Sequence, residues 1–216
     1  MSPHEHSHSG HAHGARGPHG NPADLAGYIA RMEDPSRDEW QRPDEVIAAL
    51  GLRRGMQVGE IGAGPGYFTL RLGRAVGASG HVFAVEVEPE VLSVLRDRIE
   101  ASGLRNVSPV LGLPADAFVP RGSCQRILML NVFHHFPAPA AYLERLATSL
   151  APGGTLAIVD FHDRETPVGP PVELRVSRRQ ALAHARKAGL RVVRELTFLP
   201  HQYFVVLKTG RARTVK

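Results

Sequence analysis

The sequence predicts an α/β protein in which helices cover both faces of a mostly parallel sheet. From about residue 52, short apolar runs of strand length alternate with amphipathic helical patterns. Parallel neighbours need crossover connections, and those crossovers cover the sheet. The chain ends with two strand-like runs separated by only three residues, which is too short a link for a crossover. Its 216 residues suffice for one sizeable core.

Three regions follow one another along the chain. Residues 1–23 are mainly Gly, Pro, Ser, Ala and His with little to bury, so we expect a disordered, His-rich tail. Residues 24–51 carry spaced apolar anchors and predict a helical lead-in that Gly51 ends. In this segment Tyr28 and Trp40 anchor the lead-in on the core or form part of a lid. Residues 52–210 then form the main domain.

Apolar runs in the main domain predict five buried strands, at 56–61, 81–86, 107–111, 126–131 and 155–160. Helical patterns lie between most of them, around 68–76, then up to Gly103, and then from 142 to 150. The stretch between residues 111 and 126 shows no clear helix. Ser177 and Gln180 form a capping-box pattern that opens a last helix, which ends at Gly189. Runs at 191–198 and 202–208 should pair antiparallel at one side of the sheet.

Composition limits the cellular setting and the partners. The single cysteine, Cys124, excludes an internal disulfide framework and suits a reducing cytoplasm. No segment approaches the length of apolar sequence that spans a membrane. The formal charge of +5 could suggest nucleic acid, but the arginines are spread along the chain. A solvated basic surface is therefore the preferred interpretation, and we expect neither a membrane nor a nucleic acid as partner.

The stretch VGEIGAGPGYF, residues 58–68, contains the end of the first predicted strand and the glycine-rich loop that follows it. The three glycines that follow Glu60, which are Gly62, Gly64 and Gly66, let the backbone turn sharply and approach a ligand closely. The third glycine of a dinucleotide fingerprint would stand at Tyr67, so the spacing departs from that motif. Glu60 would repel a phosphate and attract a cationic group. The loop therefore predicts a site for a ligand that carries positive charge.

Glu86 ends the second predicted strand, twenty residues beyond Gly66. A carboxylate at this position can accept hydrogen bonds from both hydroxyl groups of an adenosine ribose. Strands of an open parallel sheet bind their ligand beyond their carboxyl ends, where the strand order reverses. Glu60 and Glu86 should therefore face the same ligand.

Several motifs in order resemble those of the class I S-adenosylmethionine-dependent methyltransferases, over residues 40–208. These are VGEIGAGPGYF, AVEVEP, NVFHHF and LAPGGTLAIVD. The resemblance implies a Rossmann-like, doubly wound sheet of seven strands whose last two form an antiparallel hairpin, and it implies S-adenosyl-L-methionine as cofactor. The cofactor-binding residues that it indicates are Glu60, Ile61, Gly62, Ala63, Gly64, Gly66, Glu86, Val87, Asp116 and Asn131.

The sequence departs from this family after the third strand. Many relatives carry an acidic residue there that meets the adenine amine, whereas this chain has Leu113 and Pro114. Either Asp116 takes that role, or backbone and apolar contacts alone hold the adenine.

Asn131, His134 and His135 follow the fourth strand, next to the expected position of the methyl group. Relatives with a His-His pair here are mostly small-molecule methyltransferases. The histidines either supply a base or substrate contact, because a base helps when the nucleophile must lose a proton, or they cap a helix and pack. We therefore expect transfer of a methyl group to a small molecule, with His134 and His135 as the candidate catalytic residues.

Two alternative functions remain. The basic charge suggests an RNA-modifying methyltransferase, and the histidine-rich start suggests a metal-binding protein whose domain only senses the cofactor. Imidazoles bind Ni(II), Zn(II) and Cu(II), and the irregular spacing favours adventitious binding over a rigid site. The candidate metal ligands are His4, His6, His8, His11 and His13. The methyl acceptor and the oligomeric state are left open by the sequence.

Overall fold

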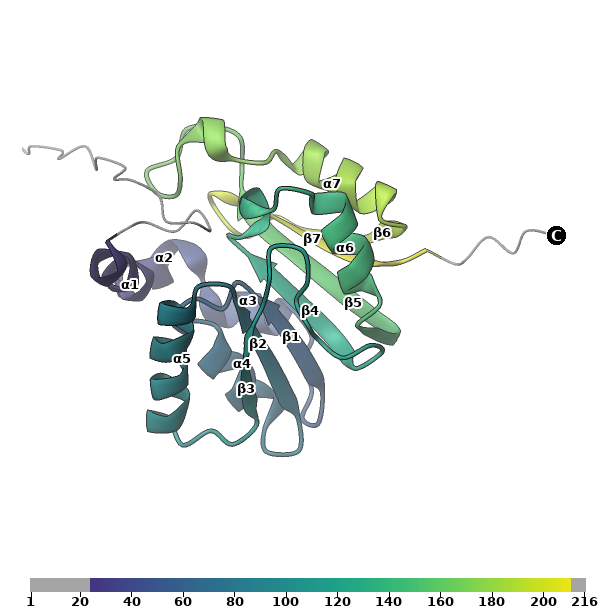
Figure 1. The fold of residues 1–216 in the computed structure, drawn as a ribbon. Coiled ribbons are helices and arrows are strands. Elements are labelled where there is room, and N and C mark those ends of the chain that lie inside the picture. The colour runs from purple at the N-terminus through teal and green to yellow at the C-terminus, as the bar shows by residue number, and fades with distance from the viewer. Residues whose placement is uncertain (1–23, 211–216) are drawn as a thin grey trace, which may run out of the picture.

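The computed structural model describes residues 24–210, whose seven strands form one sheet in the order β3-β2-β1-β4-β5-β7-β6 (Figure 1). β1 to β5 run parallel, and β7 runs antiparallel to both β5 and β6. This arrangement confirms the predicted Rossmann-like sheet and its C-terminal antiparallel hairpin. The strands are β1 (Gln57–Ile61), β2 (His81–Glu86), β3 (Val107–Leu111), β4 (Cys124–Leu130), β5 (Leu150–Phe161), β6 (Leu190–Leu196) and β7 (Gln202–Thr209).

Helices cover both faces of the sheet, as the alternating pattern predicts. α4 (Thr69–Val76) and α5 (Pro89–Ala101) pack on one face, together with α3 (Pro43–Ala49) from the lead-in. α6 (Pro139–Ala147) and α7 (Arg178–Lys187) pack on the other face. Each side chain on a buried strand therefore meets one of two helical layers, and Leu72 and Leu128 are fully buried in the first of the two cores. Burying a leucine of this kind contributes about 2 kcal/mol.

The lead-in consists of three short helices, α1 (Leu25–Glu33), α2 (Arg37–Gln41) and α3 (Pro43–Ala49). Prolines explain the interruptions, because a proline disfavours helical backbone in the residue before it. Pro35 lies between α1 and α2, and Arg42 takes the left-handed conformation, φ 45°, immediately before Pro43. After α3, Gly51 is left-handed with φ 62°, as expected of the glycine that ends the lead-in.

Two predicted boundaries were wrong by several residues, namely the end of α6 and the start of β5. The helix expected to reach residue 150 ends at Ala147, and β5 begins at Leu150 rather than at 155. Leu150 pairs with Cys124, which extends the ladder across a register shift in β4. Gly153 is left-handed, φ 76°, within this extension. The glycines at 153 and 154 therefore belong to an irregular strand start rather than to a turn that precedes the strand.

In the C-terminal part, the structure confirms the predicted capping box at the start of α7. The Ser177 hydroxyl accepts a hydrogen bond from the Gln180 backbone, and the Gln180 side chain accepts one from the Ser177 amide, so the capping box is present. The short helices η1 (Phe133–His135) and η2 (Val172–Leu174) lie in the loops that follow β4 and β5. No helix forms between β3 and β4, as predicted.

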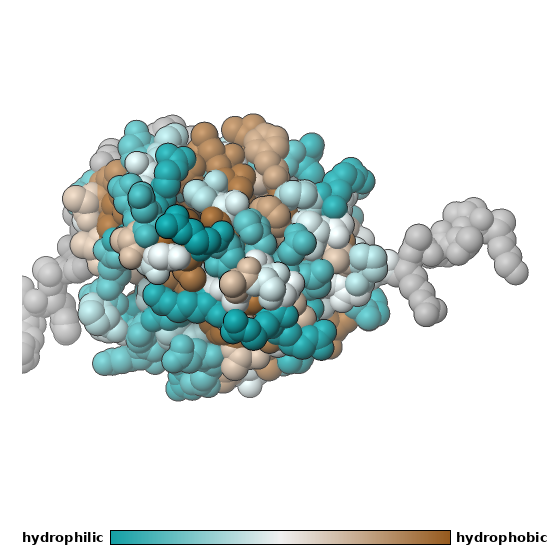
Figure 2. Space-filling view, turned by 90° about the horizontal axis from the view of Figure 1, so that it is seen from below, coloured by the Kyte–Doolittle hydropathy of each residue, from teal (hydrophilic) through white to brown (hydrophobic). Residues whose placement is uncertain are grey.

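The surface is mixed. In the view of Figure 2, hydrophilic residues predominate and hydrophobic residues form smaller patches between them. Among residues 24–210, none of the helices combines the length and the apolar character that crossing a membrane requires.

Candidate active site

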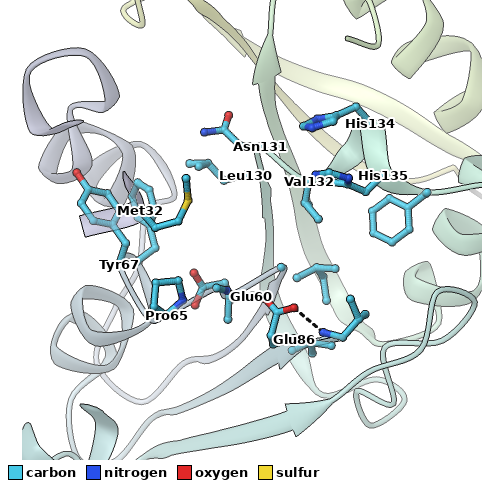
Figure 3. A pocket seen from close by; sticks show the side chains of 18 of the residues that line it. Met32, Glu60, Pro65, Tyr67, Glu86, Leu130, Asn131, Val132, His134 and His135 are labelled. Carbon is cyan, nitrogen blue, oxygen red and sulfur yellow. Dashed lines mark hydrogen bonds between the residues drawn. The ribbon is translucent and has the colours of Figure 1, made fainter. Parts of the chain in front are cut away.

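A cavity of about 440 Å³ lies at the carboxyl ends of β1, β2 and β4. The strand order reverses between β1 and β4, which is where open parallel sheets bind their ligands. Strand ends, the loops behind them and the lead-in helices all contribute to its wall (Figure 3). Eight of the ten predicted cofactor-binding residues line it: Glu60, Ile61, Gly62, Ala63, Gly64, Glu86, Val87 and Asn131.

The glycine loop forms one wall of this cavity. Gly62, Gly64 and Gly66 all have positive φ, at 76°, 55° and 103°. A Cβ atom on Gly62 would lie 2.6 Å from Cγ2 of Val132, so the loop approaches the end of β4 more closely than any other residue type allows. Gly62 and Ala63 both donate backbone hydrogen bonds to Val85, which anchors the loop on β2. Gly66 lies outside the cavity wall, and its missing side chain makes room for Leu95.

Glu86 is buried at the end of β2 and points its carboxylate at the loop (Figure 3). One carboxylate oxygen accepts a hydrogen bond from the Gly64 amide at 2.9 Å. The other oxygen accepts from the amides of Val87 and Glu88, at 2.7 and 3.0 Å. Three backbone donors therefore fix this carboxylate, and the oxygen that accepts from Gly64 keeps acceptor capacity for a ligand.

Glu60 is also buried on the cavity wall, and its carboxyl group accepts a 2.5 Å hydrogen bond from the Thr69 hydroxyl. Burial raises the pKa of Glu60 to about 8, although the Thr69 hydrogen bond and the Arg37 guanidinium both favour the charged form. In the protein alone, Glu60 therefore holds its proton at neutral pH. Glu60 therefore attracts a cation, as its position in the sequence suggests, only when the cation lies close enough to lower this pKa, so that the proton is released to solvent.

Arg37 faces the same cavity from α2 and was not identified from the sequence. Its guanidinium lies 4.0 Å above the Tyr67 ring and donates to the Met32 carbonyl at 3.0 Å. The side chain is buried, its Nε has no hydrogen-bond partner within the described part of the chain, and burial lowers its pKa. A buried guanidinium with an unused donor is a site for an anionic oxygen. Tyr28, from α1, lines the cavity beside it, with its hydroxyl near Gly64.

Asn131 connects the lead-in to the sheet. The Asn131 amide donates to Gln41 at 3.0 Å, Gln41 donates to Gln202 at 2.9 Å, and Gln202 donates back to Asn131. Gln41 and Gln202 are fully or almost fully buried, so this ring of three amides satisfies polar groups that water cannot reach. Asn131 adopts the left-handed conformation, φ 56°, which asparagine tolerates better than most residues.

The histidine pair lies across the cavity from Met32 and Tyr67 (Figure 3). His134 and His135 are the last two residues of η1, and the centroids of their rings are 4.1 Å apart. Nδ1 of His134 lies 3.2 Å from a carboxylate oxygen of Asp160, at the end of β5. The His134 side chain is 8% exposed and the Asp160 side chain is 0% exposed. The sequence places Asp160 at the end of a predicted strand, which was a usable signal, but the pairing depends on β4 and β5 being neighbours.

Asp116 lies outside this cavity. Its carboxylate receives a hydrogen bond from Arg145 at 3.2 Å and another from the Phe118 amide at 2.9 Å. Pro114, by contrast, lines the cavity. The histidines proposed as metal ligands lie outside the described residues. Within residues 24–210, no group of three or more histidine, cysteine or acidic side chains could hold a metal ion.

Comparison with known proteins identifies the family. Residues 58–154 match the family model described as a methyltransferase domain. A crystal structure of an S-adenosylmethionine-dependent methyltransferase from Aquifex aeolicus is 30% identical, with a TM-score of 0.80, and the match covers 85% of this chain and 97% of that one.

Two curated relatives extend the comparison. A protein-L-isoaspartate O-methyltransferase from Methanothrix thermoacetophila is 36% identical over 109 residues, which are 50% of this chain and 49% of that protein. The chain thus spans about half the length of this first curated relative. YdaC of Bacillus subtilis, described as an uncharacterized methyltransferase, is 24% identical over 76% of this chain and 85% of its own. Given the fold and the Aquifex match, the chain belongs to the class I S-adenosylmethionine-dependent methyltransferases.

Proposed function

We propose that this chain transfers the methyl group of S-adenosylmethionine to a small-molecule acceptor bound in the same cavity. One observation carries the proposal: the two carboxyl groups of Glu60 and Glu86 and the histidine pair, His134 and His135, line the same cavity. A volume of about 440 Å³ is within the range of small-molecule sites. The lead-in contributes Tyr28, and helps to close the cavity over such ligands.

Glu86 would bind the ribose of the cofactor. Its carboxylate is already oriented by three backbone amides, so it need not reorganise to accept a hydrogen bond from a ribose hydroxyl group. Val87 and Pro114 form apolar parts of the wall near this end. This favours apolar and backbone contacts for the adenine over a contact with Asp116, whose carboxylate is held by Arg145.

Glu60 and Arg37 would bind the two charges of the methionine part. An α-ammonium beside Glu60 would stabilise the carboxylate, so that the proton that burial otherwise keeps on this group is released to solvent. An α-carboxylate at Arg37 would use the Nε donor that is otherwise without a partner in the described structure. The pair is complementary to a zwitterion, and neither charge would then be buried without compensation.

The cofactor supplies a methyl group on a sulfonium, so the protein's main task is to align the acceptor with it. The relatives' names point to different acceptors: isoaspartate residues of proteins for one group, and ubiquinone or menaquinone precursors for the C-methyltransferase UbiE of Vibrio vulnificus, 28% identical over 56% of this chain. The acceptor must therefore be inferred from this chain's own cavity. Its volume of about 440 Å³ favours a small molecule over an RNA or a folded protein.

Calorimetry with S-adenosylhomocysteine, the demethylated cofactor, tests this proposal. Glu86→Gln should weaken binding about 10- to 100-fold, because a hydrogen bond to a charged group contributes about 1.5–3 kcal/mol. Glu90→Gln, an exposed carboxylate on the same loop-to-helix junction, is the matched control and should bind normally. If S-adenosylhomocysteine does not bind the unsubstituted protein, the proposed function is overturned. Unchanged affinity in Glu86→Gln would remove only the ribose role.

A further inference from the structure

Asp160 is a buried carboxylate whose orientation is fixed on several sides. One of its oxygens accepts from the Phe161 amide at 2.8 Å. The other accepts from the Phe133 amide at 3.1 Å and faces Nδ1 of His134 at 3.2 Å. Backbone donors stabilise a charge at a position with no access to solvent. The carboxylate therefore presents a fixed acceptor to His134.

This contact determines the tautomer of the His134 imidazole. A hydrogen bond from Nδ1 to a carboxylate keeps the proton on Nδ1 and leaves Nε2 as the basic nitrogen. His134 lines the cavity, so Nε2 is the nitrogen that a ligand there can use. Asp160 also stabilises the imidazolium ion that forms when Nε2 takes up a proton.

The wall around the pair is apolar and partly aromatic. Phe136 and Tyr142 both line the cavity, and their rings are in contact, with centroids 4.0 Å apart and an interplanar angle of 32°. Val132 and Pro137 complete this part of the wall. A flat apolar acceptor fits such a surface, with a polar group directed at His134.

We infer that His134, oriented by Asp160, is the base that removes the proton from an aromatic hydroxyl group of the acceptor. This inference rests on the proposed function. The hydroxyl proton moves to Nε2, and an oxygen electron pair forms the new bond to the methyl carbon. The electrons of the breaking carbon–sulfur bond stay on sulfur. The sulfonium becomes a neutral thioether, His134 becomes an imidazolium ion beside Asp160, and the product is an aryl methyl ether.

Phenol and thiophenol, supplied with methyl-labelled S-adenosylmethionine, test this role. Phenol keeps its proton at neutral pH, as tyrosine does, and needs a base. Thiophenol is already largely ionised there and reacts as the thiolate without one. The matched variant is His134→Asn, whose amide can still donate to Asp160 and so keeps the buried carboxylate paired. His81→Asn, at the amino end of β2, serves as control.

His134→Asn should lower kcat for phenol about 100-fold or more, the usual contribution of a general base, and leave transfer to thiophenol nearly unchanged. Asp160→Asn should reduce transfer to phenol in the same selective way, because an amide at this position no longer holds the Nδ1 proton. S-adenosylhomocysteine affinity, measured in each variant, reports whether the fold and the cofactor site are intact.

Three results would overturn the inference. Equal losses for the two acceptors in His134→Asn would show a packing role only. If the unsubstituted protein methylates thiophenol but not phenol, His134 and Asp160 do not activate hydroxyl groups. Transfer to neither, with S-adenosylhomocysteine bound, would exclude this acceptor class while leaving the cofactor part of the proposed function standing.

Discussion

The protonation state of Glu60 should depend on whether a ligand is bound. Its carboxyl group is buried beside Thr69 and its pKa is raised to about 8 from the ordinary 4.5. Folded protein therefore keeps this proton over a pH range in which unfolded protein has lost it. The contribution to stability is complete below about pH 4.5 and is lost as pH rises to about 8. A cation bound next to Glu60 would instead favour the ionised form of this carboxyl group in the folded protein.

Binding of the cofactor should release a proton from Glu60. At about pH 6.5 the α-amino group of the ligand stays protonated, so it adds little to the count. Calorimetry of S-adenosylhomocysteine in buffers of different ionisation enthalpy measures the protons released, and we expect close to one per site. Glu60→Gln keeps the shape of the side chain and should abolish the release. An equal release by this variant would mean that another group loses the proton.

Arg37 should discriminate between ligands with and without a carboxylate. Arg37→Gln is expected to weaken S-adenosylmethionine binding about 10- to 100-fold, because a charged hydrogen bond contributes about 1.5–3 kcal/mol. Decarboxylated S-adenosylmethionine keeps the sulfonium and the amine and should bind both proteins alike. Competition binding with the two ligands measures the difference. Equal weakening of both would assign Arg37 to packing of the lead-in rather than to the carboxylate.

Local sequence identified the glycine loop and Glu86 because their chemistry is contained in a few consecutive residues. Arg37 and Asp160 escaped because each acts across the fold. Arg37 comes from α2 to a cavity that the ends of distant strands also line, and Asp160 meets His134 only because β4 and β5 are neighbours. Nor does sequence indicate that Glu60 is buried deeply enough to stay protonated.

At the scale of elements, strands and the main helices were predictable because apolar periodicity is local and strong. The irregular start of β5 was not, because it depends on Leu150 finding a partner in Cys124. The attachment of α2 was not predictable either. It depends on the amide ring formed by Gln41, Asn131 and Gln202, residues that lie far apart in the chain.

The amide ring should stabilise the lead-in and the cofactor site together. Gln41→Ala leaves buried groups of Asn131 and Gln202 without their partner, which should lower the free energy of unfolding by about 1–3 kcal/mol. Cofactor affinity should fall as well, because Arg37 lies on the same short helix. Chemical denaturation and calorimetry measure the two effects. Glu39→Ala, on the exposed side of α2, is the control, and a loss of equal size there would contradict the role of the ring.

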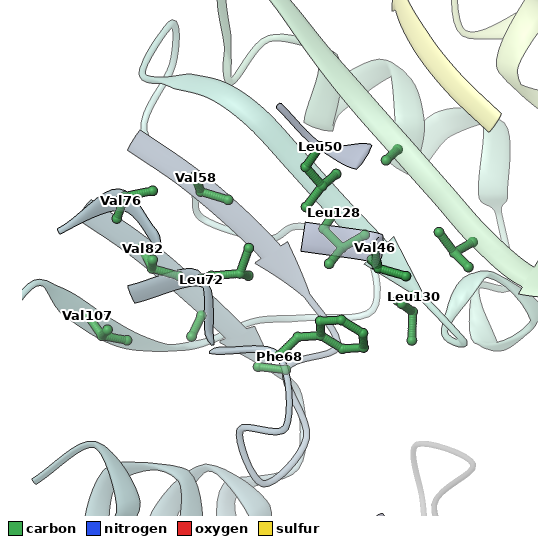
Figure 4. Close-up of a cluster of buried hydrophobic side chains, with 14 of the residues drawn as sticks. Val46, Leu50, Val58, Phe68, Leu72, Val76, Val82, Val107, Leu128 and Leu130 are labelled. Atoms are coloured by element: carbon green, nitrogen blue, oxygen red, sulfur yellow. The ribbon is translucent and has the colours of Figure 1, made fainter. Parts of the chain in front are cut away.

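For the molecule as a whole, the lead-in and the sheet share one core. Val46 and Leu50, from α3 and the residue after it, are almost completely buried against Leu128 and Leu130 of β4 (Figure 4). The Leu50 carbonyl also accepts a hydrogen bond from Arg126 at 2.8 Å. The segment that carries Arg37 and Tyr28 to the cavity is thus continuous with a helix that completes the fold.

Leu50→Ala should therefore destabilise the whole protein cooperatively, by about 2–5 kcal/mol, as expected when a buried leucine is truncated. Leu113→Ala is the matched control, because Leu113 is 51% exposed and its loss should change the free energy of unfolding by less than about 0.5 kcal/mol. Denaturant titrations followed by circular dichroism measure both. A chain that begins at Leu52 would expose the apolar face of β4 and should not unfold in a cooperative transition. A sharp transition at the natural midpoint would instead mean that residues 52–210 fold independently of α3.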